Sequence, residues 1–303
     1  MTKDRFVLID AFALIHRAFH AIPPLTTKDG NLVNAVYGFT SALLSSIKNL
    51  DPEYLACGFD LPGPTRHHEV FKEYKAHRPP TPDALSSQIP FVKEVLKTFN
   101  IPIVAAEGYE GEDIIATIVA KLKAQNSNVK TMQFIIVTGD MDCLQLIDEQ
   151  TKVYSMARGI NQAVMYDIEK VKERYGLMPS QFVDFKALKG DPSDNIPGVP
   201  GIGEKGAAKL ISDYKNLENI YQNLPKLSGK LQTLLQEKKE QAFLSQKLSK
   251  ISHDAPIDFK LADAKVHDYN KEKVKKLFLE LGFKSLVARL PESKLQDNQQ
   301  KLL

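Results

Sequence analysis

Three short apolar runs, each closed by aspartate, constrain the fold of this 303-residue chain more than any other feature. The runs RFVLID, YLACGFD and QFIIVTGDMD end at Asp10, at Asp60 and at the pair Asp140 and Asp142. Such runs are typical of parallel strands buried on both faces. Because helical patterns such as residues 35–50 and 91–99 alternate with them, we expect an α/β fold with a twisted, mostly parallel sheet flanked by helices.

The aspartates that close these runs should meet at one edge of the sheet. Ligands of open α/β sheets bind beyond the carboxyl ends of the strands, where the strand order reverses. Acids scattered over the surface by chance would not recur at strand ends. We therefore favour a shared crevice over a set of unrelated solvated charges.

The stretch GYEGEDIIA, residues 108–116, adds Glu110, Glu112 and Asp113 directly ahead of an apolar helical pattern. Acids in a first helical turn are stabilised by free N–H groups and by the helix dipole, so capping is one interpretation. Capping uses one or two carboxylates, however, and a third adds repulsion. Since we expect a short strand at 103–105 and a helix from near Glu112, these acids would face the same crevice.

The stretch LKGDPSDNIPG contributes Asp191 and Asp194, which share one face if the segment is helical and form an ordinary turn if it is a loop. Nine acids from five segments would repel each other or retain protons unless cations bound among them. Oxygen ligands without Cys or His favour Mg²⁺ or Mn²⁺ over zinc. Two such ions about 4 Å apart can activate a water and neutralise the leaving oxygen in phosphoryl transfer.

The stretch GIGEKG, residues 201–206, matches the G-x-G-x-x-G dinucleotide fingerprint. That fingerprint requires a preceding strand, whereas prolines and turns precede it here and a helix is expected over 207–214. We therefore reject a dinucleotide site. A glycine hairpin between two helices can instead offer N–H groups to a DNA phosphate and carbonyls to a monovalent cation.

Two basic regions indicate contact with a polyanion. Residues 66–82 interleave basic side chains with the rings of Phe71 and Tyr74, which suits single-stranded nucleic acid, although a solvated helix or flexible loop remains the alternative. Residues 200–250 hold nine lysines against five acids, a pattern that also fits a solvated helical face.

The composition, 43% hydrophobic and 25% charged, allows a proper core in one large domain or two smaller ones. No apolar run approaches the ~20 residues of a membrane span, and residues 1–10 lack the pattern of a signal peptide, so we expect a cytosolic protein. Cys57 and Cys143 sit in apolar stretches and are interpreted as buried, inert thiols. His16 and His20 lie one helical turn apart but lack the neighbours of a zinc site.

The motifs LIDAFALIHRAFHA, VYGF, FDLPGPTRHHEVFKEYKAHRPPTP, GYEGEDIIA, TGDMDCLQL and GDPSDNIPGVPGIGEKGAAKL follow one another in this order. Together they resemble the 5′ nuclease (flap endonuclease) family, and within it most closely the 5′ to 3′ exonuclease domain of bacterial DNA polymerase I. The resemblance covers roughly residues 5–290. It implies a resolvase-like (PIN-like) α/β nuclease domain over 1–176, with a helical arch around 66–90. It further implies a helical DNA-binding region over 177–290, with a helix-three-turn-helix (helix-hairpin-helix type) element and its hairpin at 196–206. Residues 291–303 would form a polar tail or linker.

The same resemblance implies roles for individual residues. One metal would be held by Asp10, Asp60, Glu110, Glu112 and Asp113, and the second by Asp140, Asp142, Asp191 and Asp194. The catalytic group would consist of Lys75 and Arg78, which grip the scissile phosphate from the arch, together with Asp140 and Asp142. The residues expected to contact DNA are Arg17, Arg66, Lys72, Tyr74, Lys75, Arg78, Gly198, Gly201, Gly203 and Lys205, with K⁺ expected at the glycine hairpin.

Four positions depart from the family pattern. Glu112 stands where aspartate is usual, which moves that carboxylate outward by one methylene. Ala11 replaces a usual glycine, Met141 a usual lysine and Gly206 a usual threonine. None of these changes removes an acid, so both metal sets are expected.

The function implied is that of a Mg²⁺-dependent nuclease, with Mn²⁺ as a substitute, that cleaves near a junction between duplex and single strand. Its substrates would be DNA with a 5′ single-stranded end or flap and RNA-primed DNA, during replication and repair in the bacterial cytoplasm at the nucleoid. A DNA polymerase domain, in cis or in trans, would be its partner, and no membrane is involved. The alternatives are a junction-binding module of the same fold that has lost turnover, and a dinucleotide-dependent enzyme.

Overall fold

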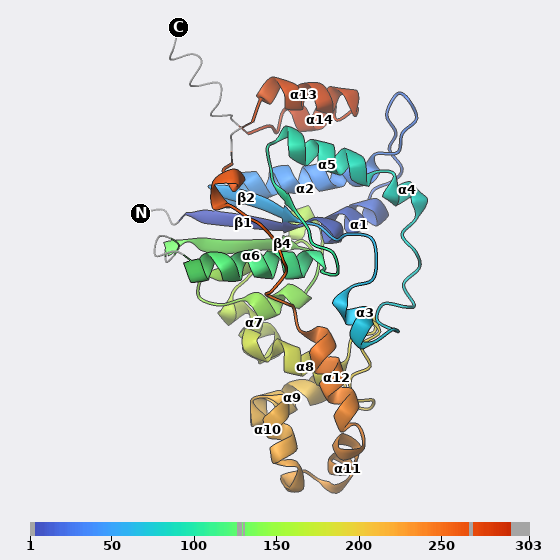
Figure 1. Cartoon of the computed structure of the whole chain (residues 1–303), viewed down its shortest axis with the longest axis vertical. Coiled ribbons are helices and arrows are strands. Elements are labelled where there is room, and N and C mark those ends of the chain that lie inside the picture. The colour runs from blue at the N-terminus through green and yellow to red at the C-terminus, as the bar shows by residue number, and fades with distance from the viewer. Residues whose placement is uncertain (1–3, 126–128, 130, 267–268, 292–303) are drawn as a thin grey trace.

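The computed structural model describes residues 4–125, 129, 131–266 and 269–291. It places a sheet between two layers of helices, with a further group of helices extending from one end (Figure 1). The expected tail at 291–303 lies outside the described residues except for Pro291. None of the described helices has the length and apolarity that a membrane span requires.

The sheet has six strands in the order β3-β2-β1-β4-β5-β6. Its strands are β1 (Arg5–Asp10), β2 (Tyr54–Gly58), β3 (Ile103–Val104), β4 (Gln133–Thr138), β5 (Thr151–Ser155) and β6 (Val164–Tyr166). Every neighbouring pair is parallel except β5 and β6. The chain order reverses between β1 and β4, so the expected mostly parallel sheet is confirmed and its switch point lies beside Asp10.

Two apolar cores cover the two faces of the sheet. Alternate residues of β1 divide between them, with Phe6 and Leu8 in one core and Val7 and Ile9 in the other. The second core includes residues of α1 (Ala11–Ala21), α2 (Asn34–Leu50) and α5 (Ile89–Thr98), while α6 (Gly111–Gln125) and α7 (Ile168–Tyr175) contribute to the first. Burial of both faces explains why the strands have uninterrupted apolar sequences.

The helices beyond the sheet form a separate group at the lower end of the molecule (Figure 1). They are α8 (Phe182–Lys189), α9 (Glu204–Tyr214), α10 (Leu217–Gln222), α11 (Gly229–Glu237) and α12 (Lys239–Ser249). The chain then returns to the sheet, where α13 (Lys271–Glu280) and α14 (Lys284–Val287) join the core that holds α2 and α5. The range 177–290, expected to be one helical region, is therefore split in space between two places.

Only two short helices lie within the segment that was expected to form a helical arch. They are α3 (Arg66–Val70) and α4 (Asp83–Ser86), and turns and extended chain connect them. Prolines at 79, 80 and 82 lack an N–H group and explain why no longer helix forms there.

The glycine stretch at 201–206 follows α8 and a series of turns, all of them described, and no strand lies between α8 and the glycines. The strand that the dinucleotide fingerprint requires before its first glycine is therefore not present in this described part of the chain. Helix α9 begins at Glu204, three residues earlier than expected, so Gly206 lies in its first turn.

Candidate active site

The acids converge because three neighbouring strands deliver them to one edge of the sheet. Asp10 ends β1, Asp60 follows β2 by two residues, and Asp140 follows β4 by two. The N-terminus of α6 meets them there at Gly111, whose N–H donates to the Asp60 carboxylate. A side chain at this glycine would start 3.2 Å from Asp60 Oδ1 and 3.5 Å from Asp10 Oδ1. A residue without a side chain therefore lets the helix approach both strands.

Asp10 and Asp60 lie in an environment that disfavours their negative charge. Asp10 Oδ2 accepts from Thr138 Oγ1 at 2.7 Å, and Oδ1 caps α1 by accepting from the Ala13 N–H at 3.2 Å. Burial, and then the charge of Asp60, raises the pKa of Asp10 to about 7. Burial and Glu110 likewise raise the pKa of Asp60 to about 6. A nearby cation would therefore stabilise the ionised form of both carboxyl groups.

The three acids of GYEGEDIIA divide between the two interpretations that the sequence left open. Asp113 acts as a cap, because Oδ2 accepts from the Glu110 N–H at 3.0 Å and Oδ1 accepts from the Ser252 N–H at 2.7 Å. Glu112 is the surplus charge: burial, followed by repulsion from Asp140 and Asp142, raises its pKa well above the usual value. Capping and cation binding are therefore both supported in this stretch.

The second set of acids is built around a lysine that sequence reasoning missed. The Lys186 ammonium donates to Asp142 Oδ2 and lies 2.7 Å from Asp191 Oδ2. Burial and Asp140 raise the pKa of Asp142 to about 7, although Lys186 opposes that rise. The pKa of Asp191 falls to about 2 despite its burial, because Lys186 and Ser193 stabilise its charge. Nothing in the letters FVDFKALK marks this lysine as buried, so only the packing of α8 could have identified it.

Lys75 and Arg78 reach the acids directly. Lys75 Nζ lies 2.6 Å from Glu110 Oε2 and 3.8 Å from Asp194 Oδ2. Arg78 pairs with Asp194 and also donates to the Ser193 carbonyl at 3.0 Å. Burial disfavours the charged Lys75, but Glu110 and Asp194 outweigh it, so the net pKa of Lys75 is raised. Lys75 thus lies against carboxylates of both sets, and Arg78 lies against one carboxylate of the second set.

The position of Tyr74 corrects one expectation. Its side chain was expected to stack on single-stranded bases, yet it is only 2% exposed. Its hydroxyl donates to Asp194 Oδ2 at 3.1 Å and lies 3.4 Å from Glu110 Oε2. These two carboxylates hold the hydroxyl, and with it the ring, inside the protein, so Tyr74 orients acids and offers no stacking face.

The remaining residues expected to contact DNA lie at different places. Arg66 is exposed, pairs with Asp254 at 2.9 Å and contacts the Tyr109 hydroxyl at 2.6 Å. Lys72 and Lys205 are exposed, and Arg17 is half-buried on α1 with its guanidinium near Gly159.

The hairpin glycines differ from one another. Gly198 has a φ of +60° and is held by Ser245 and Gln241, which bond its N–H at 3.0 Å and its carbonyl at 2.8 Å. Gly201 is exposed with a φ of +96°. Gly203 has a φ of −84° and caps α9. The hairpin geometry thus requires glycine at 198 and 201 but not at 203.

The chemistry of the donors fits a hard divalent cation, since they are buried or half-buried carboxylates whose charges repel one another. Among the residues that the structure describes, no three or more Asp, Glu, His or Cys side chains are arranged to hold a metal ion as they stand. Lys75 and Lys186 instead occupy positions between the acids. A divalent ion that binds here would therefore share the carboxylates with these two lysines or displace the lysines from them.

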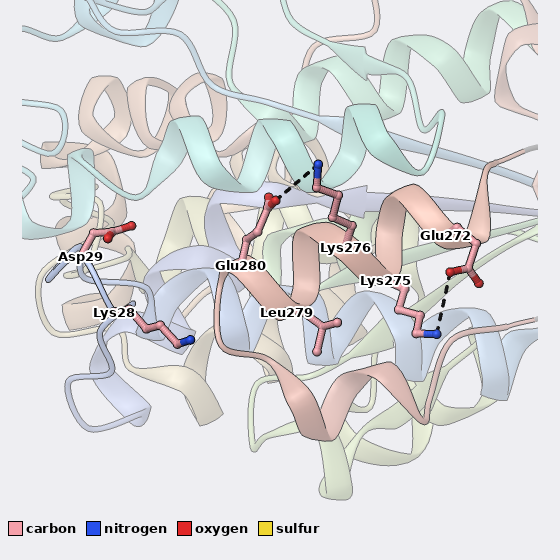
Figure 2. Close-up of a pocket in the computed structure, with 7 residues that line it drawn as sticks. All are labelled: Lys28, Asp29, Glu272, Lys275, Lys276, Leu279 and Glu280. Atoms are coloured by element: carbon pink, nitrogen blue, oxygen red, sulfur yellow. Dashed lines mark ion pairs between the residues drawn. The ribbon is translucent and has the colours of Figure 1, made fainter.

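A separate pocket of about 500 Å³ lies between α13 and the loop at Lys28 and Asp29 (Figure 2). The charged side chains that α13 contributes pair with one another, Glu272 with Lys275 and Lys276 with Glu280. It contains none of the converging acids, so we assign it no part in their chemistry.

Two family models match the chain. One is the 5′-3′ exonuclease N-terminal resolvase-like domain over residues 5–176, and the other is the 5′-3′ exonuclease C-terminal SAM fold over residues 177–272. DNA polymerase I of Caldicellulosiruptor bescii is 42% identical over 94% of this chain, and that of Bacillus subtilis is 39% identical over 99%. These matches take up 33% and 34% of the relatives, so the chain spans about a third of their length.

Solved structures share the fold. The T5 D15 protein crystallised with metal ions aligns with a TM-score of 0.66 at 22% identity, covering 82% of this chain and 89% of that one. Flap endonuclease-1 from Methanococcus jannaschii aligns with a TM-score of 0.59 at 17% identity, covering 95% and 90%. At such identities the likeness establishes the architecture alone.

Proposed function

The chain belongs to the 5′-3′ exonuclease family, and from this premise we propose that it is a structure-specific 5′ nuclease. It would hydrolyse phosphodiester bonds near a junction between duplex and single strand, as a 5′ to 3′ exonuclease and as a 5′-flap endonuclease. The observation that carries this proposal is the convergence of buried carboxylates with raised pKa values at the switch point of the sheet. A cluster of carboxylates of this kind is suited to cations and, through them, to phosphate.

Two Mg²⁺ ions, or Mn²⁺ in their place, would supply Lewis acidity and an activated water when bound. The ligands of the first would come from Asp10, Asp60, Glu110, Glu112 and Asp113. The ligands of the second would come from Asp140, Asp142, Asp191 and Asp194. Both carboxylate oxygens of Asp113 already accept hydrogen bonds from backbone N–H groups. Asp113 would therefore support the first ion mainly by fixing the start of α6.

The cationic side chains of the 71–80 segment would act on the substrate. Lys75 pairs with Glu110, and Arg78 pairs with Asp194. A phosphate bound beside these carboxylates would contact both basic side chains. Arg17, Arg66 and Lys72 would follow the single strand by charge. In the hairpin, Gly201 and Gly203, with Lys205 beside them, would hold the duplex backbone through N–H groups and K⁺. Gly198, whose N–H and carbonyl bond to Ser245 and Gln241, would shape the hairpin.

The substrates that fit this arrangement are DNA with a 5′ flap or single-stranded 5′ end and RNA-primed DNA, in replication and repair. The curated relatives are bacterial DNA polymerases I about three times as long as this chain, which supports a polymerase partner in cis or in trans. We place the activity in the bacterial cytoplasm, at the nucleoid. A junction-binding module without turnover is the second candidate, and cleavage of a flap separates the two.

Removing one carboxylate tests the metal assignment. Asp140→Ala should lower the rate of 5′-flap cleavage in Mg²⁺ at least 100-fold, because a ligand is lost, while flap affinity changes only a few-fold. Rates come from single-turnover cleavage and affinities from fluorescence anisotropy in Ca²⁺. Asp258→Ala is the matched control: it removes an exposed acid next to Phe259, which stacks on Phe6 near the start of β1, far from the carboxyl edge. Cleavage retained in Asp140→Ala would defeat the assignment.

Lys75 is expected to act in the chemical step. Lys75→Ala should reduce kcat about 100-fold and change KM little, because the ammonium stabilises charge that develops on the phosphate. Lys72→Ala, an exposed lysine of the same segment, should change KM more than kcat. Equal effects of Lys75→Ala on binding and turnover would reduce Lys75 to a phosphate anchor.

A further inference from the structure

Lys186 occupies an unusual position for a lysine. It lies on α8, is only 4% exposed, and directs its ammonium at two carboxylates, Asp142 and Asp191. Lysine is almost never fully buried without an ionic partner, because an isolated buried charge is costly. The lysine and the two aspartates therefore form one buried ionic unit.

This unit is anchored from several elements. Asp142 begins the 3₁₀ turn Asp142–Leu146, and its N–H donates to Asp140 Oδ1 at 2.9 Å. Asp191 Oδ1 accepts from the Ser193 N–H at 2.8 Å and from Ser193 Oγ at 2.6 Å. The free carboxylate edges of both aspartates thus point at one ammonium, in a position that is fixed relative to Asp140.

The two acid sets differ in how far the protein neutralises them. Lys186 pairs with Asp142 and Asp191, and Arg78 pairs with Asp194, so three of the four acids of the second set face a protein cation. In the first set Lys75 pairs with Glu110, while Asp10 and Asp60 bond to a hydroxyl and an N–H group. A divalent cation gains less from the second set, because an ammonium already stands there.

We propose that Lys186 is a positioning residue that serves as the resident cation of the second acid set. It holds Asp142 and Asp191 together without metal and weakens the binding of a divalent ion there until an additional anion, a phosphate group, is present. Binding of the second ion is thereby tied to binding of phosphate. This inference rests on the proposed function, since it concerns the metals that the two sets would hold.

The test is a Mn²⁺ titration of the free protein, followed by electron paramagnetic resonance. Wild type should show one tighter and one weaker site. Lys186→Met should tighten the weaker site at least tenfold, because the competing charge is gone, and Lys186→Arg, which keeps it, should match wild type. Addition of dAMP, a phosphate-bearing mononucleotide, should tighten the weaker site of wild type more than that of Lys186→Met. Unchanged or weaker Mn²⁺ binding in Lys186→Met would overturn the proposal, as would Lys186→Arg behaving like Lys186→Met.

A charge-balanced pair covers the case in which Lys186→Met does not fold. Asp191→Asn leaves Lys186 with Asp142, and the double variant Lys186→Met/Asp191→Asn removes one charge of each sign. The double variant should bind Mn²⁺ at the weaker site several-fold more tightly than Asp191→Asn, and equal affinities would overturn the proposal. Flap cleavage by wild type is scored separately. If wild type cleaves the flap but replacement of Lys186 does not change Mn²⁺ affinity, this inference alone is rejected. If replacement of Lys186 changes Mn²⁺ affinity but wild type does not cleave the flap, the proposed nuclease activity alone is rejected.

Discussion

At the scale of single residues, folding brings carboxyl groups of the candidate site close together, where their negative charges repel one another. Asp10, Asp60 and Asp142 carry pKa values raised to about 7, 6 and 7 by burial and by neighbouring acids. A folded chain that binds protons more tightly than the unfolded chain loses stability as the pH rises through the folded pKa. The same groups are the ones that a divalent cation would stabilise, so metal binding and stability are coupled here.

The substitution Asp10→Asn tests this coupling between metal binding and stability. The pKa of Asp10 moves from 3.8 unfolded to about 7 folded, so its contribution to stability is present below about pH 4 and is lost by about pH 7. In EDTA at pH 8, Asp10→Asn should therefore be more stable than wild type, by on the order of 4 kcal/mol before its neighbours adjust. At pH 4 the two proteins should be nearly equal.

Thermal or urea unfolding at both pH values measures this difference, and comparison of the two proteins cancels groups that titrate in both, such as His16, whose burial lowers its pKa. Mg²⁺ at pH 8 should stabilise wild type more than Asp10→Asn, because the variant lacks one carboxylate of the first set. A variant less stable than wild type at pH 8 would show that Asp10 is a structural cap and not a strained ligand.

At the scale of elements, the glycine hairpin depends on a close contact between two loop positions. Gly190 and Gly198 lie back to back, and a side chain on Gly198 would start 2.3 Å from the Gly190 nitrogen. Both have positive φ, +76° and +60°. The turn that holds Asp191 and Asp194 and the hairpin that follows it are therefore built on one glycine pair, so the acids and the hairpin share a support.

The hairpin glycines should respond differently to substitution. Gly198→Ala meets both a positive φ and backbone atoms, and should cost about 3 kcal/mol or more in unfolding free energy. Gly203→Ala has φ −84° and nothing within 4 Å of the new carbon, and should cost about 1 kcal/mol or less. Urea denaturation measures both. A loss of duplex affinity in the folded Gly203→Ala protein would report on the phosphate contact, and comparable stability losses in the two variants would contradict this account of the hairpin.

The elements that local pattern dictates were predictable, and the contacts between distant segments were not. Apolar runs closed by aspartate identified β1, β2 and β4, since strands buried on both faces leave that pattern in any sequence. The inward turn of Tyr74 and the burial of Lys186 depend on partners more than 40 residues away, at Asp194 and Asp142. Residue type alone suggested an exposed stacking ring for Tyr74, and it gave no signal for Lys186.

At the scale of the whole molecule, one edge of the sheet faces both the 71–80 segment and the loop between α8 and α9 of the helical group. Hydrogen bonds join the two: the Lys75 N–H donates to the Asp194 carbonyl at 3.0 Å, and the Asn195 amide donates to the Glu73 carbonyl at 2.6 Å. Chain that returns from α12 also fixes α6, through the Ser252 N–H and Asp113. The acids thus lie where the α/β part and the helical part meet, a place that a junction between duplex and single strand could span.

The most direct measurement of the central claim is a cleavage map. The purified chain is incubated with an end-labelled 5′-flap duplex in Mg²⁺, in EDTA, and in Mg²⁺ with a blunt duplex of the same sequence, and the products are resolved to the nucleotide. Our account predicts Mg²⁺-dependent cuts within a few nucleotides of the junction, none in EDTA, and slower cutting of the blunt duplex. Tight binding of the flap with no cutting in Mg²⁺ or Mn²⁺ would contradict it and would identify a junction-binding module.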